Sequence, residues 1–422
     1  MKNLVPRFIL EQVLQKNYAG DFSASAIFID ISGFTKMTQK LMETGKEGAE
    51  ILSDIINEIY TPAIQTIYDW NGFITAFAGD AFTAVFPDKS SQPLFALNAA
   101  SKIQHLFEQA NRKNSRFEQF QLSAKLGVSY GNVRWKIIKS DCQNAYFFRG
   151  EAIENSVACE QNATAGEIVI DEKIAEIVGK SIEATRQTAP FYQLESCQHI
   201  EKPLVKWPAV SPELYNDFVP EPILNLNIKG EFRNIVSCFV AFHEDENFGQ
   251  YLGEILNLSH SFGGYFNKID FSDKGGNVLV LFGAPTGTEK MFARACDFAL
   301  AVYSLKGFKT RIGMASGSAF TGFVGSQLRS EYTALGAVVN LSVRFMTQAE
   351  WGNIYIGQEI YRNIEKAYKA KCLGGIHCKG FAYEVPVYRL EQQRKTNLFF
   401  AGKLVGRKQE LHERFLEMLT KL

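Results

Sequence analysis

Short apolar runs alternate with longer amphipathic stretches along the chain, and the same series occurs twice. The run SAIFIDISGF opens the first series at Ser25, and NIVSCFVAFH opens the second at Asn234. Each run precedes a helical stretch, a glycine turn and a hairpin, and a further helix is predicted at 94–111 and at 290–303. The order strand, helix, two strands, helix, strand predicts a ferredoxin-like α+β fold (βαββαβ) for each half.

A fixed offset of 186 residues relates the later parts of the two series. It aligns KLGVSYGNV with RIGMASGSA, and it superposes three pairs of glycines: Gly127 on Gly313, Gly131 on Gly317, and Gly150 on Gly336. Self-similarity at a fixed spacing indicates two copies of one structural unit, and a proline-rich stretch separates them. We therefore expect an N-terminal segment over 1–20, a first domain over 21–200, a linker over 201–230, a second domain over 231–392, and a C-terminal connector and helix over 393–422.

The charge balance limits the partners that can be expected. The 422 residues include 45 basic and 45 acidic side chains, so no overall basic field exists to attract nucleic acid or an anionic membrane. No apolar run reaches the roughly 18 residues that span a bilayer, and the N-terminus lacks the pattern of a signal peptide. The seven cysteines are scattered, with Cys372 and Cys378 as the one close pair, which predicts reduced thiols rather than zinc ligands. We expect a cytoplasmic protein with no transmembrane segment and no nucleic-acid partner.

Two carboxylates occupy positions suited to cation binding. Asp30 ends an apolar run just before the predicted start of a helix, whereas Asp80 lies in the tight turn of the first hairpin. In a ferredoxin-like fold these positions fall on neighbouring central strands, where paired carboxylates suit two divalent ions about 4 Å apart. The amides at the helix N-terminus would then receive phosphate. The alternative is that Asp30 caps a helix and Asp80 is an ordinary turn residue.

The second copy lacks both carboxylates and carries other polar groups. Ala241 and roughly Gly276 stand at the corresponding positions. Its own polar positions are Lys268, Thr333, Asn340 and Arg344, for which the first copy has Ala76, Phe147, Glu154 and Ala158. Taken singly, Lys268 and Arg344 could be ordinary surface residues, but Asn340 and Arg344 share one helix face because they are four residues apart. Each copy thus lacks the polar groups that the other carries. This predicts one composite site between the copies and a degenerate site at the position related to it by the repeat.

These motifs resemble those of the class III nucleotidyl cyclases, and most closely the soluble, bicarbonate-type adenylyl cyclases and their bacterial relatives. The matching stretches are IFIDISGFTKMT, FAGDAFTAVF, FNKIDFSDKGG and EYTALGAVVNLSVRFM, and the resemblance covers about residues 20–390. It implies two cyclase domains that form an intramolecular pseudo-heterodimer, active as a monomer, and that convert ATP to cyclic AMP. The alternatives are a guanylyl cyclase and a catalytically silent module that binds nucleotide to regulate a partner.

The resemblance assigns roles to individual residues. Asp30 and Asp80, with the backbone carbonyl of Ile31, would bind two Mg²⁺ or Mn²⁺ ions. Asn340 would orient the ribose, and Arg344 would stabilise the charge that builds on the α-phosphate. The candidates for phosphate binding are the amides of Gly33, Phe34 and Thr35 and the side chains of Lys125 and Arg329.

Lys268 and Thr333 correspond to the base-reading pair of the family. Adenine presents an acceptor at N1 and a donor at N6, which match a lysine donor and a threonine acceptor, whereas guanine presents the reverse. Guanylyl cyclases of this family have glutamate at the lysine position, so the resemblance implies ATP as the substrate.

The chain departs from the bicarbonate-activated enzymes in the degenerate site. Those enzymes carry a lysine and an arginine where this chain has Ala76 and Val157. We therefore expect an activity that does not respond to bicarbonate. The ending LVGRKQELHERFLEML resembles the entry to an ATPase module that often follows such cyclase pairs, so we expect C-terminal regulatory domains outside this chain.

Overall fold

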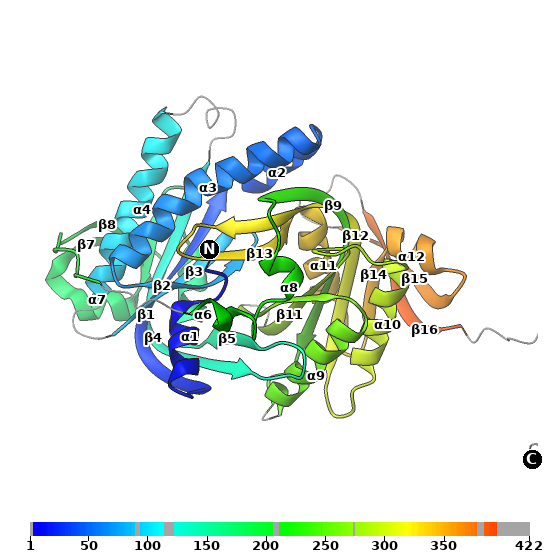
Figure 1. The fold of residues 1–422 in the computed structure, drawn as a ribbon. Helices are drawn as coiled ribbons and strands as arrows, with labels where there is room; N and C mark the ends of the chain where they lie inside the picture. The colour runs from blue at the N-terminus through cyan, green and yellow to red at the C-terminus, as the bar shows by residue number, and fades with distance from the viewer. Residues whose placement is uncertain are drawn as a thin grey trace, which may run out of the picture.

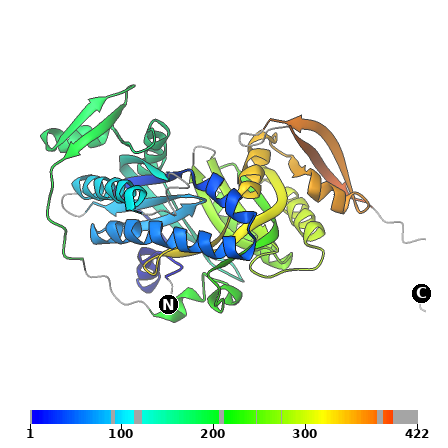
Figure 2. The ribbon, with the colours of Figure 1, turned by 90° about the horizontal axis from the view of Figure 1, so that it is seen from above.

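Each half of the chain forms its own sheet covered by helices (Figure 1). The computed structural model describes residues 3–88, 93–113, 122–205, 211–245, 247–272, 275–377 and 384–394. Within these ranges the two halves lie side by side, and a β-hairpin from each projects at opposite ends of the molecule (Figure 2).

The first half holds the blue to green elements of Figure 1. Its elements are α1 (Arg7–Leu14), β1 (Ala19–Ser32), α2 (Phe34–Met42), α3 (Lys46–Asp69), β2 (Phe73–Ala78), β3 (Ala81–Pro87), α4 (Pro93–Lys113), β4 (Ser123–Ile138), β5 (Ala145–Arg149), α6 (Glu151–Gln161), β6 (Ile168–Asp171), α7 (Glu172–Val178), η1 (Gly179–Ser181), β7 (Ile182–Arg186) and β8 (Phe191–Cys197). The strand order is β2-β3-β1-β4-β6-β8-β7, and β5 pairs with β4.

The second half repeats this order. After η2 (Pro212–Tyr215) and α8 (Glu221–Leu224), its elements are β9 (Gly230–Phe242), α9 (Phe248–Ser261), β10 (Tyr265–Ser272), β11 (Gly275–Phe282), α10 (Met291–Tyr303), β12 (Thr310–Gly325), β13 (Ser330–Leu335), α11 (Ala337–Gln348), β14 (Ile354–Gly357), α12 (Gln358–Ile364), β15 (Tyr368–Ile376) and β16 (Val385–Gln393). The sheet runs β10-β11-β9-β12-β14-β16-β15, with β13 paired to β12. The predicted pair of ferredoxin-like α+β domains is therefore confirmed, and the two amphipathic helices predicted after the hairpins are α4 and α10.

The strand registers identify which residues of the two halves are equivalent. Asp30 pairs with Ala81 between β1 and β3, and Ala241 pairs with Asn277 between β9 and β11, so Ala241 stands in the place of Asp30. A bulge lies immediately before Ala76 in β2 and immediately before Lys268 in β10, which makes these two residues equivalent. The second hairpin is longer, because Lys268 pairs with Leu279, 11 positions on, whereas Ala76 pairs with Thr83, 7 positions on.

The repeated glycines Gly127 and Gly313 lie where a helix packs closely against a strand. A Cβ atom at Gly127 in β4 would lie 2.0 Å from the carbonyl oxygen of Ser156 in α6, and one at Gly313 in β12 would lie 2.3 Å from that of Ser342 in α11. No larger residue fits there without moving the helix away from the sheet. The same close helix approach therefore occurs in both halves, and it fixes where α11 lies relative to β12.

The interface between the halves is part of the hydrophobic core. One contiguous cluster of buried side chains includes Phe77 and Ile153 of the first half and Tyr332 and Leu335 of the second. Burial of apolar surface on this scale is the main favourable term in folding and association. The two domains are therefore joined by a packed interface as well as by the chain.

The segment between the two sheets lies against the first half. The predicted linker over 201–230 falls between β8 and β9, and in its described part Phe218 accepts a hydrogen bond from Gln143 Nε2 at 2.7 Å. Beyond β16, the C-terminal helix predicted within 393–422 lies outside the described residues, as does Cys378.

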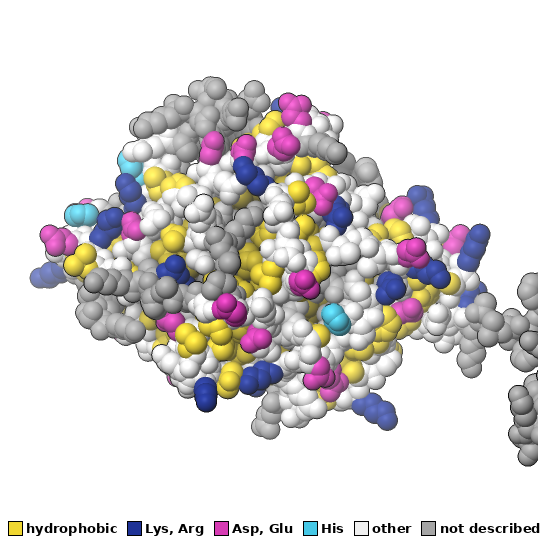
Figure 3. Space-filling model, in the orientation of Figure 1, with side chains coloured by type: hydrophobic (Ala, Val, Ile, Leu, Met, Phe, Trp, Pro, Cys, Tyr) yellow, Lys and Arg dark blue, Asp and Glu magenta, His cyan; other side chains and the backbone are white. Residues whose placement is uncertain are grey.

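Charged side chains of both signs are interspersed over the face drawn in Figure 3, in keeping with the balanced composition. None of the helices in the described ranges is both long enough and apolar enough to traverse a lipid bilayer.

Candidate active site

The two predicted cation-binding carboxylates lie at adjacent positions of the first sheet. Asp30 pairs with Ala81 across β1 and β3, so Asp80 is the residue directly before the partner of Asp30. Both aspartates are partly exposed. Helix α2 has Gly33 as its N-cap and no side chain caps it, which argues against the alternative role of Asp30 as a helix cap.

A buried glutamate that the sequence analysis missed belongs to this group. Lys125 pairs with Asp30 across β1 and β4, with its Nζ 3.7 Å from Asp30 Oδ2, and it forms a closer ion pair with Glu160 of α6. Burial raises the pKa of the Glu160 carboxyl, against the lowering effect of Lys125. Nothing in the matched motifs marks Glu160. In this structure Lys125, a predicted phosphate ligand, is directed at these two carboxylates.

The donor set fits a hard divalent cation. Carboxylate and carbonyl oxygens are the ligands that Mg²⁺ and Mn²⁺ prefer, and Asp30, Asp80 and the backbone of buried Ile31 supply them. The Lys125 ammonium beside Asp30 indicates that a positive charge is favourable there. Among the described residues no group of three or more His, Cys, Asp or Glu side chains gathers. A site of two carboxylates, completed by water and substrate phosphates, is typical of Mg²⁺.

The predicted phosphate cradle lies at the start of α2. Gly33 has a φ of 91°, a left-handed conformation that glycine adopts without strain. Phe34 is buried and lines a small cavity together with Asp80, so the start of α2 and the hairpin turn face the same space. Thr35 lies in α2, and its side chain is outside the described part of the structure. The first amides of a helix have no intrahelical acceptor and carry partial positive charge.

Helix α11 of the second half closes this cavity. Asn340 is exposed on α11 and lines this small cavity with Phe34, Asp80 and Gly336. Arg344 lies one turn further along α11 and is partly buried. The structure thus brings the hairpin turn of the first half together with the helix that carries Asn340 and Arg344.

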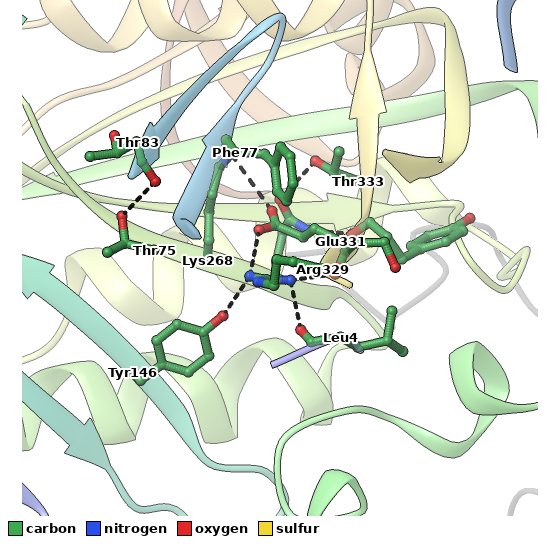
Figure 4. Close-up of polar contacts among 12 residues, drawn as sticks. Leu4, Thr75, Phe77, Thr83, Tyr146, Lys268, Arg329, Glu331 and Thr333 are labelled. Carbon is green, nitrogen blue, oxygen red and sulfur yellow. Dashed lines mark hydrogen bonds and ion pairs between the residues drawn. The ribbon is translucent and has the colours of Figure 1, made fainter. Parts of the chain in front are cut away.

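Lys268 points across the interface towards the first half (Figure 4). Its Nζ donates to the carbonyl oxygen of Phe77 in β2 and lies 3.8 Å from Glu331 Oε1. Thr333, in β13, donates to Asn267 Oδ1 at 3.0 Å. Alternation along β13 puts Glu331 on the same face as Thr333, and this was the signal that could have identified it. The Glu331 Oε1 atom is buried and accepts no hydrogen bond among the described residues.

Arg329 requires a correction. Its side chain has no exposed surface, so the predicted contact with phosphate is not available to it. Its guanidinium donates to the carbonyl oxygen of Leu4 at 3.0 Å and to Tyr146 Oη at 2.9 Å, and it lies 3.6 Å from Glu331 Oε2 (Figure 4). Arg329 therefore joins the N-terminal segment, the first half and the second half at one buried point.

Aromatic side chains lie at the position that the sequence predicts to be degenerate. Phe147, the counterpart of Thr333, packs on Phe271 with ring centroids 4.8 Å apart. Arg149 lies over the rings of Phe271 and Phe248. Ala76 and Phe147 line a second cavity at the interface, together with Lys268 and Glu331.

Comparison with known proteins agrees with this architecture. The model of the adenylate and guanylate cyclase catalytic domain matches residues 268–392. Human adenylate cyclase type 10 is 25% identical over 453 residues, covering 92% of this chain and 28% of that protein. The rabbit (Oryctolagus cuniculus) protein of the same name is 24% identical over 386 residues, covering 77% of this chain and 24% of that protein. The chain thus spans only about a quarter of the length of these relatives.

Among solved structures, a class III adenylyl cyclase-like ATP-binding protein from Pseudomonas aeruginosa shares the fold. The TM-score is 0.57 at 14% sequence identity, with 82% of this chain and 85% of that chain covered. That alignment extends over both sheets, whereas the family model covers residues of the second half alone. Residues 268–392 thus match the cyclase catalytic domain, and over most of its length the chain is similar in sequence to adenylate cyclase type 10 and in fold to a class III adenylyl cyclase-like protein.

Proposed function

We propose that this chain is an adenylyl cyclase that converts ATP to 3′,5′-cyclic AMP and pyrophosphate at one composite site between its halves. The observation that carries the proposal is that Asp80 of the first half and Asn340 of the second line one cavity. The matched relatives are named adenylate cyclases, which supports the choice of reaction. Because the second half has Ala241 in place of Asp30, the symmetry-related position has lost its carboxylate.

In this proposal the first half binds the triphosphate through cations. Class III cyclase domains use divalent metal ions, and we propose that Asp30, Asp80 and the Ile31 carbonyl hold two, Mg²⁺ or Mn²⁺. When bound, the ions would activate the 3′-hydroxyl and neutralise charge on the triphosphate. The amides of Gly33, Phe34 and Thr35 would receive the terminal phosphates at the positive end of α2.

The second half positions the substrate and stabilises the charge that develops. Asn340 would hold the ribose so that its 3′-oxygen faces the α-phosphorus. Arg344, one turn away on the same helix face, would donate to the α-phosphate oxygens as pyrophosphate departs. Such pre-organised donors are worth about 10²- to 10³-fold in rate.

Lys268 and Thr333 would select adenine. Lys268 would release the Phe77 carbonyl and donate to N1, and Thr333 would accept from the N6 amino group through its remaining lone pairs. The buried Glu331 carboxylate lies 3.8 Å from the Lys268 ammonium and attracts it into the interface. Guanine would place its own N1–H against the lysine donor, which costs about 1–3 kcal/mol per unpaired group.

Regulation by bicarbonate is not expected. Ala76 and Val157 carry no charge with which to hold an anion, and Phe147 and Phe271 occupy the degenerate position. The internal pairing of the two halves also makes a monomer the expected active form.

A catalytically silent nucleotide-binding module is the competing proposal, and the Pseudomonas protein of similar fold is described as ATP-binding. Incubation of the purified chain with ATP or with GTP, in the presence of Mn²⁺, separates the possibilities. Cyclic AMP from ATP supports the proposal. Formation of cyclic GMP from GTP, without cyclic AMP from ATP, would indicate a guanylyl cyclase, and nucleotide binding without either product would indicate the silent module.

A further inference from the structure

A buried tyrosine contacts the hairpin turn that carries Asp80. Tyr60, in α3, has no exposed surface, and its hydroxyl donates to the backbone carbonyl oxygen of Asp80 at 3.1 Å. Its ring packs against Phe77 and Phe82, which lie on the two strands of the hairpin, with centroids 5.9 and 5.3 Å away. One side chain therefore touches both strands and the turn between them.

The turn itself is open on its other side. Gly79 has a φ of 72°, and no atom lies within 4 Å of the point where its Cβ atom would be. A glycine in open space adds little restraint to the backbone. The hydrogen bond from the Tyr60 hydroxyl therefore restrains the turn from its inner side. On the outer side, at Gly79, no described residue packs against the turn.

The second half, which lacks both carboxylates, has a different residue at the position of Tyr60. Helices α3 and α9 end in the same way, with Gly72 N bonded to Ile67 O and Gly264 N bonded to Ser259 O, an offset of 192 residues. The bulges before Ala76 and Lys268 have the same offset. The counterpart of Tyr60 is therefore Leu252, which is also fully buried. The second half therefore keeps a buried apolar side chain at the position of Tyr60. It lacks both the tyrosine hydroxyl and the carboxylate that corresponds to Asp30.

We propose that Tyr60 is a positioning residue for the cation site: its hydroxyl fixes the Asp80 backbone so that the Asp80 carboxylate is held beside Asp30. This inference rests on the proposed two-carboxylate cation site. Tyr60 does not touch substrate or cation, and it acts through the geometry of the turn. A small displacement of a positioned group is enough to weaken binding and rate measurably.

Replacement of the hydroxyl in the full chain tests the role. Tyr60→Phe keeps the ring and its packing, and Tyr60→Leu copies the second half. Both variants should raise the free Mn²⁺ concentration for half-maximal cyclic AMP formation about 3- to 10-fold, with the ATP KM at saturating Mn²⁺ within twofold of wild type. Tyr68→Phe is the matched control, because Tyr68 is buried in the same helix eight residues further on.

Direct Mn²⁺ binding provides a readout that does not depend on catalysis. Electron paramagnetic resonance titration of Mn²⁺, with an ATP analogue that cannot cyclise, should show the same weakening in Tyr60→Phe and none in Tyr68→Phe. Unchanged Mn²⁺ binding in Tyr60→Phe, or an equal loss in Tyr68→Phe, would overturn the inference. If the wild-type chain binds Mn²⁺ and the analogue but forms no cyclic nucleotide, the proposed activity fails while the titration still decides the role of Tyr60.

Discussion

Asp80, in a hairpin turn of the first half, and Asn340, on α11 of the second half, line the same cavity. Each half contributes a kind of group that the other lacks: Ala241 replaces Asp30 in the second, and Glu154 replaces Asn340 in the first. A single reaction that needs both kinds of group can therefore take place at one interface position.

Loss of the Lys268 ammonium should weaken the discrimination between bases. Lys268→Met removes the proposed donor to adenine N1 and one of the two cations beside the buried Glu331 carboxylate. We expect kcat/KM for ATP to fall about 10- to 100-fold and the ATP-to-GTP preference to narrow. Steady-state kinetics with both nucleotides measures this. Lys229→Met, the same change at an exposed lysine, is the matched control, and it should retain the preference for ATP. An unchanged preference in Lys268→Met would contradict the assignment.

Bicarbonate should leave turnover unchanged. At the position proposed to be degenerate, Ala76, Val157, Phe147 and Phe271 carry no charge, and the nearby Arg149 is paired with Glu244. Cyclic AMP formation measured with and without bicarbonate, at fixed pH and ionic strength, should agree within the error of the assay. A several-fold stimulation would show that an anion site exists elsewhere or that the degenerate position opens.

Arg329 should be important for stability. Arg329→Met leaves Tyr146, Glu331 and the Leu4 carbonyl without the buried cation, a loss that typically costs about 3–5 kcal/mol. Denaturant unfolding of the variant measures it. The control is Arg186→Met on exposed β7, which should change stability by at most about 0.5 kcal/mol. Equal unfolding midpoints for the two variants would contradict the role given to Arg329.

Asp171 should make stability depend on pH. Burial raises the pKa of Asp171 to about 6, although the backbone amides of Ile174 and Tyr130 donate to its carboxylate. The folded state thus holds this proton more tightly than the unfolded state, in which an aspartate titrates near 4, so this group lowers stability as pH rises from about 4 to 6. Asp171→Asn keeps an oxygen for the Ile174 amide and removes the charge.

Asp171→Asn should therefore raise the unfolding free energy at pH 7 by about 1 kcal/mol and flatten its dependence on pH between 4 and 6. Unfolding at several pH values measures both. Glu172→Gln, exposed at the next position of α7, is the control and should show neither effect. A lower stability of Asp171→Asn at pH 7 would contradict the expected sign.

The fold was predictable, and the principal site residues could be proposed, because local pattern and repeat agree. The glycines at 127 and 313 are repeated because helix and strand touch there, and the offset that relates them also relates Thr333 and Asn340 to their counterparts. Asp30 is recognisable because it follows the apolar residues of a strand and lies three positions before Gly33 and the start of α2.

Other parts of the site depend on contacts that no local pattern records. From the sequence alone, Arg329 looks like a surface cation near a glutamate. In the structure it is buried, and its guanidinium donates to the Leu4 carbonyl, 325 residues away in the chain. In the sequence, Tyr60 is one more apolar position of an amphipathic helix. Its hydroxyl acquires its partner, the carbonyl oxygen of Asp80, when the hairpin packs against that helix. Glu160 is similar, because its partner Lys125 comes from a different strand.

The central claim is that Asp80 and Arg344, from different halves, serve one active site. The most direct test is the turnover of ATP to cyclic AMP at saturating Mn²⁺ by the wild type, Asp80→Ala, Arg344→Ala and Glu154→Ala, with each protein shown to be monomeric by light scattering. Asp80→Ala and Arg344→Ala should each lower kcat by about 10²- to 10³-fold. Glu154→Ala, which alters the counterpart of Asn340 in the degenerate half, should stay within twofold of wild type. Wild-type turnover in Asp80→Ala and Arg344→Ala, or an equal loss in Glu154→Ala, would contradict a single composite site.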